Sequence, residues 1–419
     1  MEVGAVVLIP ATIFFWGAVS ARWERADLSA PIVFTAVGAV LASVGQLHPE
    51  SAVDTLKPLV EVTLVWVLFS DAARVSIRDL RADAGRYVRL LALGLPLTVL
   101  AGWGLAAWLF PGLGVWLALL VGAALAPTDA ALGVPVVTNT AVPPRVRNLL
   151  SVESGLNDGI VTPVVLVALA GAASTEGLAD SPGLGAALVE LVVGAGVGVV
   201  LGGGGGWLLR WARRRGWVAE DFAGIAVLAL ALAAYAAALA VHANGFVAAF
   251  CGGLAFGATA GRRGRAELVF TAQAGSLVSL LVWLGFGAVA VPIVTERANW
   301  TIALYAVLSL TAVRMVPVAL ASAGSGLDRN AVLFIGWFGP RGLASLLFAL
   351  LALEDLGQAA NEAVAVIAVT VILSVIAHGV TAAPLAARYG RAAGRARQQG
   401  RSMDLPVPRR QRHLKTDPT

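Results

Sequence analysis

The chain is built from long apolar segments separated by short polar ones. A run of about 20 apolar residues is long enough to cross a bilayer as a helix. Thirteen such runs follow one another, and arginines, acidic residues and glycines gather between them. The pattern predicts an all-α membrane protein with spans at residues 3–19, 29–46, 57–73, 87–109, 112–138, 147–173, 183–209, 221–241, 244–260, 270–294, 299–321, 329–353 and 361–387.

The distribution of positive charge supports this count and predicts an orientation. The loops after odd-numbered spans, together with the C-terminal tail, carry 26 of the 30 lysines and arginines. Basic loops stay on the cytoplasmic side of a membrane. We therefore expect a multi-pass protein of the cell inner (plasma) membrane, with the N-terminus outside and the C-terminus in the cytoplasm. A miscounted span would have mixed the basic loops between the two sides.

Composition excludes a water-soluble globule. Apolar residues make up 58% of the 419 positions and charged residues 13%, whereas soluble domains carry about 25% charge. Residues 1–387 form the predicted transmembrane domain. Residues 388–419 are basic and rich in glutamine and proline, so we expect a disordered cytoplasmic tail against anionic lipid rather than a nucleic-acid-binding segment.

Several other features indicate no chemistry of their own. The single cysteine, Cys251, excludes an intrachain disulfide, and the four histidines lack the spacing of a metal site. We expect no cofactor. The glycine run 202–206 lies inside a predicted span and lacks the Lys-Ser/Thr that follows in a phosphate loop. Close helix packing or a linker between repeats is its expected role.

Two predicted spans contain a break at their centre. The fifth holds the segment Ala126 to Asp129 around Pro127, and the twelfth holds Gly336 to Gly342 around Pro340 and Arg341. Proline removes an amide donor and clashes with the preceding turn. Spans five and twelve are seven apart, which favours two inverted six-helix repeats joined by the seventh helix. Paired broken helices typically mark a transporter's binding site, although two ordinary proline kinks are the alternative.

The sixth span carries four polar residues within six positions: Glu153, Ser154, Asn157 and Asp158. A carboxylate at bilayer depth costs roughly 2.5–3.5 kcal/mol, so these side chains should face the protein interior. Ser154 and Asp158 are four apart and share a helix face, whereas Glu153 and Asp158 point to different neighbours. Carboxylate, hydroxyl and carbonyl oxygens are the ligands that a hard cation such as Na⁺ prefers.

Three motifs together resemble a known transporter family: Thr128-Asp129, Glu153-Ser154-x-x-Asn157-Asp158, and Gly339-Pro340-Arg341-Gly342. They are similar to those of bacterial sodium/proton antiporters in the monovalent cation:proton antiporter family, which also includes the animal sodium/proton exchangers. The resemblance extends over roughly residues 1–387. It implies a thirteen-helix homodimer in which helices 4–6 and 11–13 form a transport bundle. Helices 1–3 and 7–10 would form the dimerisation and scaffold unit.

The resemblance also implies roles for individual residues. Asp158 would bind the ion and the proton, with Ser154 and the backbone of Thr128 as further Na⁺ ligands. Asp129 would lie beside the site, balance the half-helix ends and share in ion binding. Asp71 in the third helix would add another acidic ligand, the alternative being a cytoplasmic helix end.

A structural ion pair is also implied. Glu153 and Arg341 would form a buried pair that holds helix 6 to helix 12, with Asn157 in support. Three further deep charges, Glu61, Glu190 and Arg314, fall outside these assignments, and their roles stay open.

The expected function is secondary transport rather than catalysis by an enzyme. A carboxylate in a dry cleft can hold H⁺ or Na⁺ (or Li⁺), but not both, and alternating access would turn this exclusion into antiport. Asn157 leaves one exchanging carboxylate, which predicts electroneutral 1:1 exchange. K⁺/H⁺ exchange on the same scaffold is the nearest alternative. A cation channel and an intramembrane aspartyl protease are more distant ones.

Overall fold

The computed structural model describes residues 3–24, 29–47, 49–75, 83–129, 136, 139–177, 184–261 and 264–398. Within these ranges the regular secondary structure is entirely helical, and the helices follow the thirteen predicted spans in order. The expected all-α class is therefore confirmed. Seven helical stretches of the described chain are long and apolar enough to cross a membrane, and four shorter apolar helices of 10–17 residues accompany them.

The first six spans correspond to α1 (Val3–Glu24), α2 (Ala30–Ser43), α3 (Pro49–Arg74), α5 (Ala84–Val88) continuing into α6 (Leu95–Leu109), α7 (Gly114–Ala124) and α9 (Pro144–Thr175). The remaining seven correspond to α10 (Leu184–Arg214), α11 (Glu220–Ala240), α12 (Gly245–Thr259), α13 (Gly264–Arg297), α14 (Trp300–Leu310) with α15 (Ala312–Ser322), α16 (Arg329–Trp337) with α17 (Leu343–Leu356), and α18 (Asn361–Gln398).

The structure differs from the expected boundaries in three places. A π-helical turn at Arg89–Gly94 joins α5 to α6, and a break at Thr311 divides the eleventh span into α14 and α15. α18 continues to Gln398, so the start of the expected tail is helical rather than disordered. The rest of that tail, from residue 399, lies outside the described residues, as does most of the second half of the fifth span.

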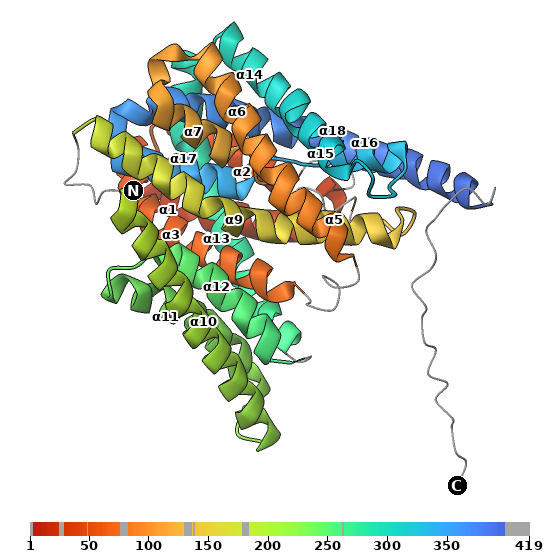
Figure 1. Cartoon of the computed structure of the whole chain (residues 1–419). Coiled ribbons are helices and arrows are strands. Elements are labelled where there is room, and N and C mark those ends of the chain that lie inside the picture. The colour runs from red at the N-terminus through yellow and green to blue at the C-terminus, as the bar shows by residue number, and fades with distance from the viewer. Residues whose placement is uncertain are drawn as a thin grey trace.

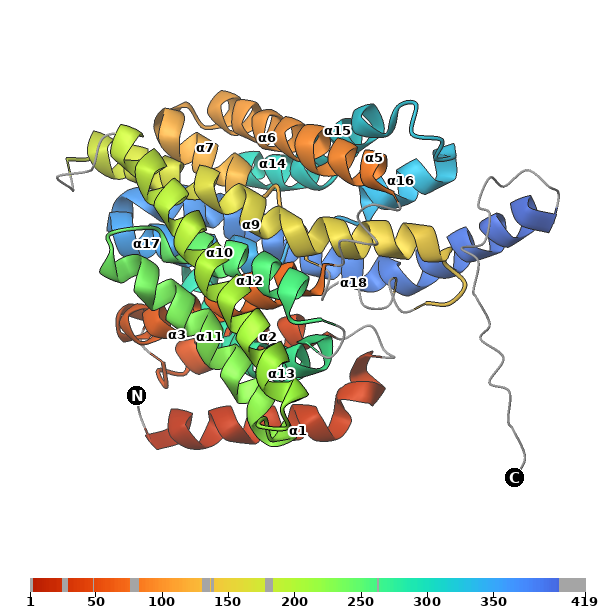
Figure 2. The ribbon, with the colours of Figure 1, turned by 60° about the horizontal axis from the view of Figure 1, so that its bottom comes forward.

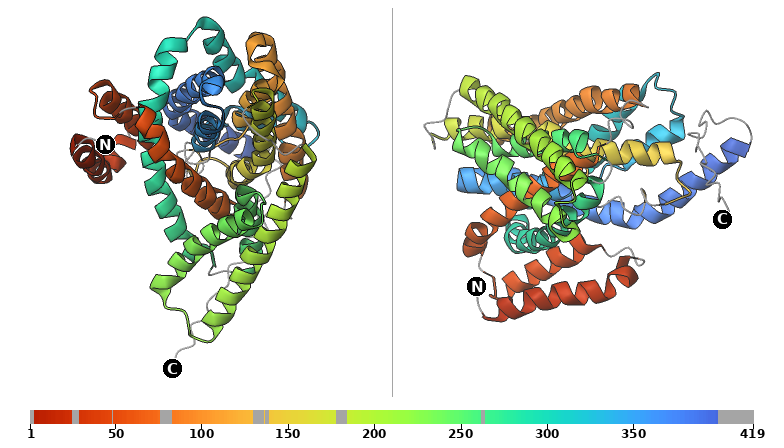
Figure 3. Two further views of the ribbon diagram at one scale, coloured as in Figure 1. Left: turned by 90° about the vertical axis from the view of Figure 1, so that its left-hand side faces the viewer. Right: turned by 90° about the horizontal axis from the view of Figure 1, so that it is seen from below.

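The helices pack in two groups. In the first, α12 lies between α10 and α3, and α13 packs on α2 and α3. In the second, α6 packs on α7, α7 on α9, and α14 and α17 on α18. Contacts of α3 with α9 and α17 join the groups. α10 and α11 extend together beyond the other helices, and α1 lies along the edge of the molecule (Figures 1, 2 and 3).

Glycines let α10 approach the backbone of α12. Gly194, Gly198 and Gly202 recur every four residues and so share one face of α10. A Cβ on any of them would collide with a backbone carbonyl of α12. Close helix packing is therefore the role of this glycine-rich face, as expected for the run that begins at Gly202.

Two glycines of α10 provide a matched test of this packing. Gly202→Ala should lower the free energy of unfolding by about 1–3 kcal/mol, because the new Cβ would overlap the carbonyl of Gly252. Gly204→Ala should be neutral or slightly stabilising, since a Cβ there meets no heavy atom within 4 Å and alanine favours helix. Thermal unfolding of both variants in detergent would check this. Equal melting temperatures would refute the packing argument.

Candidate ion-binding site

The two predicted breaks lie against each other. The first follows α7 at Leu125 to Asp129, and the second separates α16 from α17 at Phe338 to Gly342. The amide of Asp129 donates to the carbonyl of Pro340 at 2.8 Å. This hydrogen bond joins the backbones of the two breaks directly, although more than 200 residues separate them along the chain.

Arg341 from the second break closes the carboxyl end of α7. Its Nη1 donates to the carbonyls of Ala126 and Pro127 at 3.0 and 3.1 Å, and its side chain is fully buried. Ser345 of α17 donates its hydroxyl to the carbonyl of Ala124 at 2.6 Å. The last carbonyls of a helix carry partial negative charge and lack helical partners. The guanidinium supplies both the donors and the charge.

Asp129 from the first break closes the amino end of α17. Its Oδ2 accepts the amide of Leu343 at 3.0 Å, which is a favourable place for a carboxylate. A Cβ at Gly342 would collide with this carboxyl group, so the position requires glycine. Each break therefore sends its charged residue to the half-helix of the other. Both charges lie at half-helix ends, where the dipole argument from the sequence places them.

A buried network joins the first break to α9. Thr128 Oγ1 lies 3.0 Å from Ser154 Oγ, and Asn157 Nδ2 donates to Thr128 Oγ1 at 2.8 Å. All three side chains are buried. The structure thus brings together the Thr-Asp motif and the polar stretch of the sixth span. Asn157 acts here as a donor that fixes Thr128.

Asp158 lies on α9 beside this network. Its Oδ1 is buried and has no hydrogen-bond donor within the described chain. Asp129 and Asp71 both act on this carboxyl group electrostatically. A buried carboxylate oxygen without a donor is costly unless it takes up a proton or a cation. The geometry is that of an acid that can bind either.

Asp71 occupies the last turn of α3 and also faces α9. A Cβ at Gly155 would lie 3.5 Å from the carbonyl oxygen of Asp71, so the two helices are close at this point. Arg74 Nη1 lies 4.0 Å from Asp71 Oδ1. Asp71 therefore lies near the end of its helix and near the sixth span, and its role as a ligand stays a prediction.

The expected ion pair between Glu153 and Arg341 is wrong. Glu153 Oε1 pairs with Arg314 Nη1 at 2.6 Å, and both side chains are almost completely buried. Arg341 is instead held by the carbonyls of Ala126 and Pro127 in the first break. The break at Thr311 sets Arg314 in the first turn of α15, and Gly339 makes room, because a Cβ there would collide with Arg314 Nε. The sequence feature that could have indicated Arg314 as the partner is that it stands alone within an apolar span.

The other two open charges lie in different surroundings. Glu61 Oε2 accepts a hydrogen bond from the hydroxyl of Tyr235 at 3.2 Å, which joins α3 to α11. The carbonyl of Glu190 accepts the amide of Asn244 at 3.1 Å, at the start of the α10–α12 contact. Their contacts are with helices of the first group rather than with the breaks.

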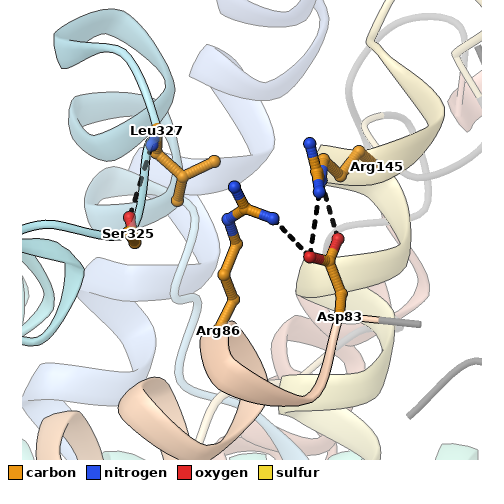
Figure 4. Close-up of polar contacts among 5 residues, drawn as sticks. All are labelled: Asp83, Arg86, Arg145, Ser325 and Leu327. Carbon is orange, nitrogen blue, oxygen red and sulfur yellow. Dashed lines mark hydrogen bonds and ion pairs between the residues drawn. The ribbon is translucent and has the colours of Figure 1, made fainter. Parts of the chain in front are cut away.

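A second charge cluster joins helix ends of the second group. Arg86 and Arg145 converge on Asp83, and Arg145 makes two hydrogen bonds to its carboxylate, at 2.7 and 3.0 Å (Figure 4). Burial opposes ionisation of Asp83, but hydrogen bonds from Arg145 and Arg86 and their charges outweigh it and hold the pKa of this carboxyl below its usual value. The cluster therefore stays ionised at neutral pH.

Arg86 also extends toward the turn before α16, where the amide of Leu327 donates to Ser325 Oγ at 3.4 Å (Figure 4). A Cβ at Gly326 in this turn would lie 3.4 Å from Arg86 Nη2. The cluster thus connects the start of α5, the start of α9 and the segment between α15 and α16.

Known proteins are similar to this chain in sequence and in fold. Residues 10–388 match the family model described as sodium/hydrogen exchanger, transmembrane. The chain belongs to this family. The exchanger is also similar in fold to the sodium proton antiporter MjNhaP1 of Methanocaldococcus jannaschii, with a TM-score of 0.74 and 19% identity over 92% of this chain and 98% of that one.

Sequence relatives match the exchanger over shorter regions. The K(+)/H(+) antiporter NhaP2 of Shewanella sp. (strain MR-4) is 31% identical over 199 residues, which are 47% of this chain and 33% of that protein. The Na(+)/H(+) antiporter 2 of Zygosaccharomyces rouxii is 33% identical over 175 residues, 37% of this chain and 20% of that protein. The matched part of the exchanger thus spans about a third of the length of NhaP2.

The corrected ion pair gives a stability test. Arg314→Met should lower the free energy of unfolding by about 3–5 kcal/mol, because it leaves Glu153 buried without a counter-charge. The double variant Arg314→Met with Glu153→Met should recover much of this loss, since neither charge remains. Thermal or denaturant unfolding of the four proteins in detergent would measure the coupling. Additive effects of the two substitutions would contradict the pairing.

Proposed function

We propose that this exchanger carries a monovalent cation in one direction and a proton in the other, with Asp158 holding the two alternately. The supporting observation is the buried Asp158 oxygen without a donor, beside two crossed helix breaks. Proton and cation compete for the same carboxylate, so the site crosses the membrane loaded with one or the other. Alternating access then couples the two fluxes. Membership of the sodium/hydrogen exchanger family agrees with this proposal.

The proposed cation ligands are oxygens from α9 and the first break. They are the Asp158 carboxylate, the Ser154 hydroxyl and the backbone carbonyl of Thr128. Ser154 is already fixed by its contact with Thr128 at 3.0 Å, which would preorganise the hydroxyl for an ion. Asp129 adds negative potential nearby, and Asp71 offers a further carboxylate from α3. A hard cation with all-oxygen coordination suits this set.

Na⁺, with Li⁺, is the proposed cation. The name of the M. jannaschii protein with the same fold gives sodium as its ion. K⁺ is the second candidate, favoured by the 31% identity to NhaP2, which is named a K⁺/H⁺ antiporter. Oxygen ligands suit both ions, and cavity size decides between them.

The charges around Asp158 favour electroneutral 1:1 exchange. Glu153 is neutralised by Arg314 rather than by Arg341. The number of carboxylates available for exchange is therefore the same as with the pairing expected from the sequence. Asp129 is engaged by the amino end of α17. Position 157 holds an amide that is already used to fix Thr128. One carboxylate then exchanges one cation for one proton.

The proposed setting is the cell inner membrane, with the N-terminus outside and the C-terminus in the cytoplasm, as the arginine-rich loops indicate. We propose a homodimer in which helices 4–6 and 11–13 move against helices 1–3 and 7–10. A secondary transporter fits better than a protease, because Asp129 closes a half-helix. It also fits better than a channel, because paired helix breaks favour alternating access over a continuous pore.

Reconstituted proteoliposomes with an internal pH dye would test this proposal. Addition of Na⁺ or Li⁺ should dissipate an imposed pH gradient, and Asp158→Asn should reduce the signal to that of empty liposomes while the protein stays folded. Asp221→Asn, at an exposed position in the first turn of α11, is the matched control and should transport normally.

The same vesicles test the ion and the stoichiometry. Parallel additions of K⁺ rank the cations, and an imposed membrane potential should leave the initial rate unchanged. Normal exchange by Asp158→Asn would refute the role of Asp158. A rate that follows the potential would refute electroneutrality alone.

A further inference from the structure

The break of the twelfth span has a support on α18 that is separate from the ion site. Ser374, His378 and Thr381 are spaced by four and three residues and so share one face of this helix. Ser374 contacts the break itself, and His378 and Thr381 contact Trp337 at the end of α16. The amide of Arg341 donates to Ser374 Oγ at 2.7 Å, and Trp337 Nε1 donates to Thr381 Oγ1 at 3.1 Å.

His378 bridges the two sides of the break. Its Nε2 lies 2.9 Å from the carbonyl of Trp337, at the end of α16. Because a carbonyl only accepts, Nε2 carries a proton. Nδ1 lies 3.1 Å from Ser374 Oγ and 2.9 Å from the Ser374 carbonyl. In the neutral ring, Nδ1 accepts from the Ser374 hydroxyl, which itself accepts the amide of Arg341.

The result is one hydrogen-bonded path across the break, from the Arg341 amide through Ser374 and His378 to the Trp337 carbonyl. The ring is 1% exposed, and its centroid lies 5.2 Å from that of the Trp337 side chain. Between these ends the carbonyl of Pro340 accepts the amide of Asp129, but the backbone amides add little further support. Pro340 has no amide proton, and the amide of Gly339 turns back to the Trp337 carbonyl.

The position of Arg341 therefore depends on α18. Its backbone is held by Ser374 and its guanidinium by carbonyls of the first break. Asp129 depends on the same segment, because it bonds to Pro340 and Leu343. A shift of this backbone would displace Asp129, which acts electrostatically on Asp158.

We propose that His378 is a positioning residue for cation binding: it fixes the end of α16 and the backbone of Arg341, and so keeps Arg341 and Asp129 at the half-helix ends. This inference rests on the proposed cation exchange for its transport consequence. Its structural part, the fixing of the break, stands independently and can be measured without transport.

Four variants on α18 separate positioning from packing. His378→Ala removes both contacts. His378→Gln restores a donor near the position of Nε2, and His378→Asn restores an acceptor near that of Nδ1. Thr370→Val is the matched control, because Thr370 is buried on the same helix and, among the described residues, its hydroxyl bonds only to the carbonyl of Val366 in α18.

Two readouts apply to each variant. Hydrogen exchange of the segment around Arg341, followed by mass spectrometry, should be about tenfold faster in His378→Ala than in the wild type. The apparent KM for Na⁺ in proteoliposomes should rise about five- to tenfold, because small misplacements of a site are costly. Gln and Asn should each restore part of both values, and Thr370→Val should change neither.

If His378→Ala leaves the hydrogen-exchange rate around Arg341 and the apparent KM for Na⁺ unchanged and only lowers the melting temperature, the inference is overturned. His378 would then be a packing residue. A wild type in which none of Na⁺, Li⁺ and K⁺ drives proton flux would refute the proposed function instead. In that case the hydrogen-exchange comparison would still decide whether His378 fixes the break.

Discussion

The candidate site depends on two interrupted helices, each of which places its charged residue against the backbone at the break of the other. Arg341 donates to the carbonyls of Ala126 and Pro127 in the first break, and Asp129 accepts an amide that the second break leaves open at the start of α17. In hydrocarbon, each of these groups would cost several kcal/mol if it were left without a partner. Neither break could therefore exist in the membrane alone, and the two have to form together.

This mutual dependence supports the proposal that cation and proton exchange concentrates on one residue, Asp158. Arg341 and Asp129 are engaged by half-helix ends, and Glu153 and Arg314 engage each other. Asp158 differs from Glu153 in this respect: Glu153 Oε2 also lacks a donor in the described chain, but Arg314 neutralises Glu153, whereas Asp158 Oδ1 lacks a donor and no arginine pairs with its carboxylate there. A buried acid in this condition is the group whose occupancy can change without loss of a structural bond. That is the property which antiport requires.

Much of this arrangement could be predicted from the sequence, because membrane constraints act locally. Helix number followed from the length of apolar runs, and the two breaks followed from Pro127 and Pro340. The partner of Glu153 could not be predicted in this way. Two buried arginines were available, and the choice depended on which one the carbonyls of the first break had already engaged. The break at Thr311 could not be predicted either, because it carries neither proline nor glycine.

The ion pairs also restrict how such a site can move. A buried charge that loses its partner is strongly destabilising, so a rearrangement that separates Glu153 from Arg314 is disfavoured. The contacts of α9 with the first group are of another kind. Gly155 lies against the backbone of Asp71, and Gly159 lies under the ring of Phe250. Smooth surfaces of this sort can slide without loss of hydrogen bonds. Because Asp158 is next to Gly159, a rigid displacement of α9 along this surface would carry the acid with it, and the crossed breaks would travel as one body.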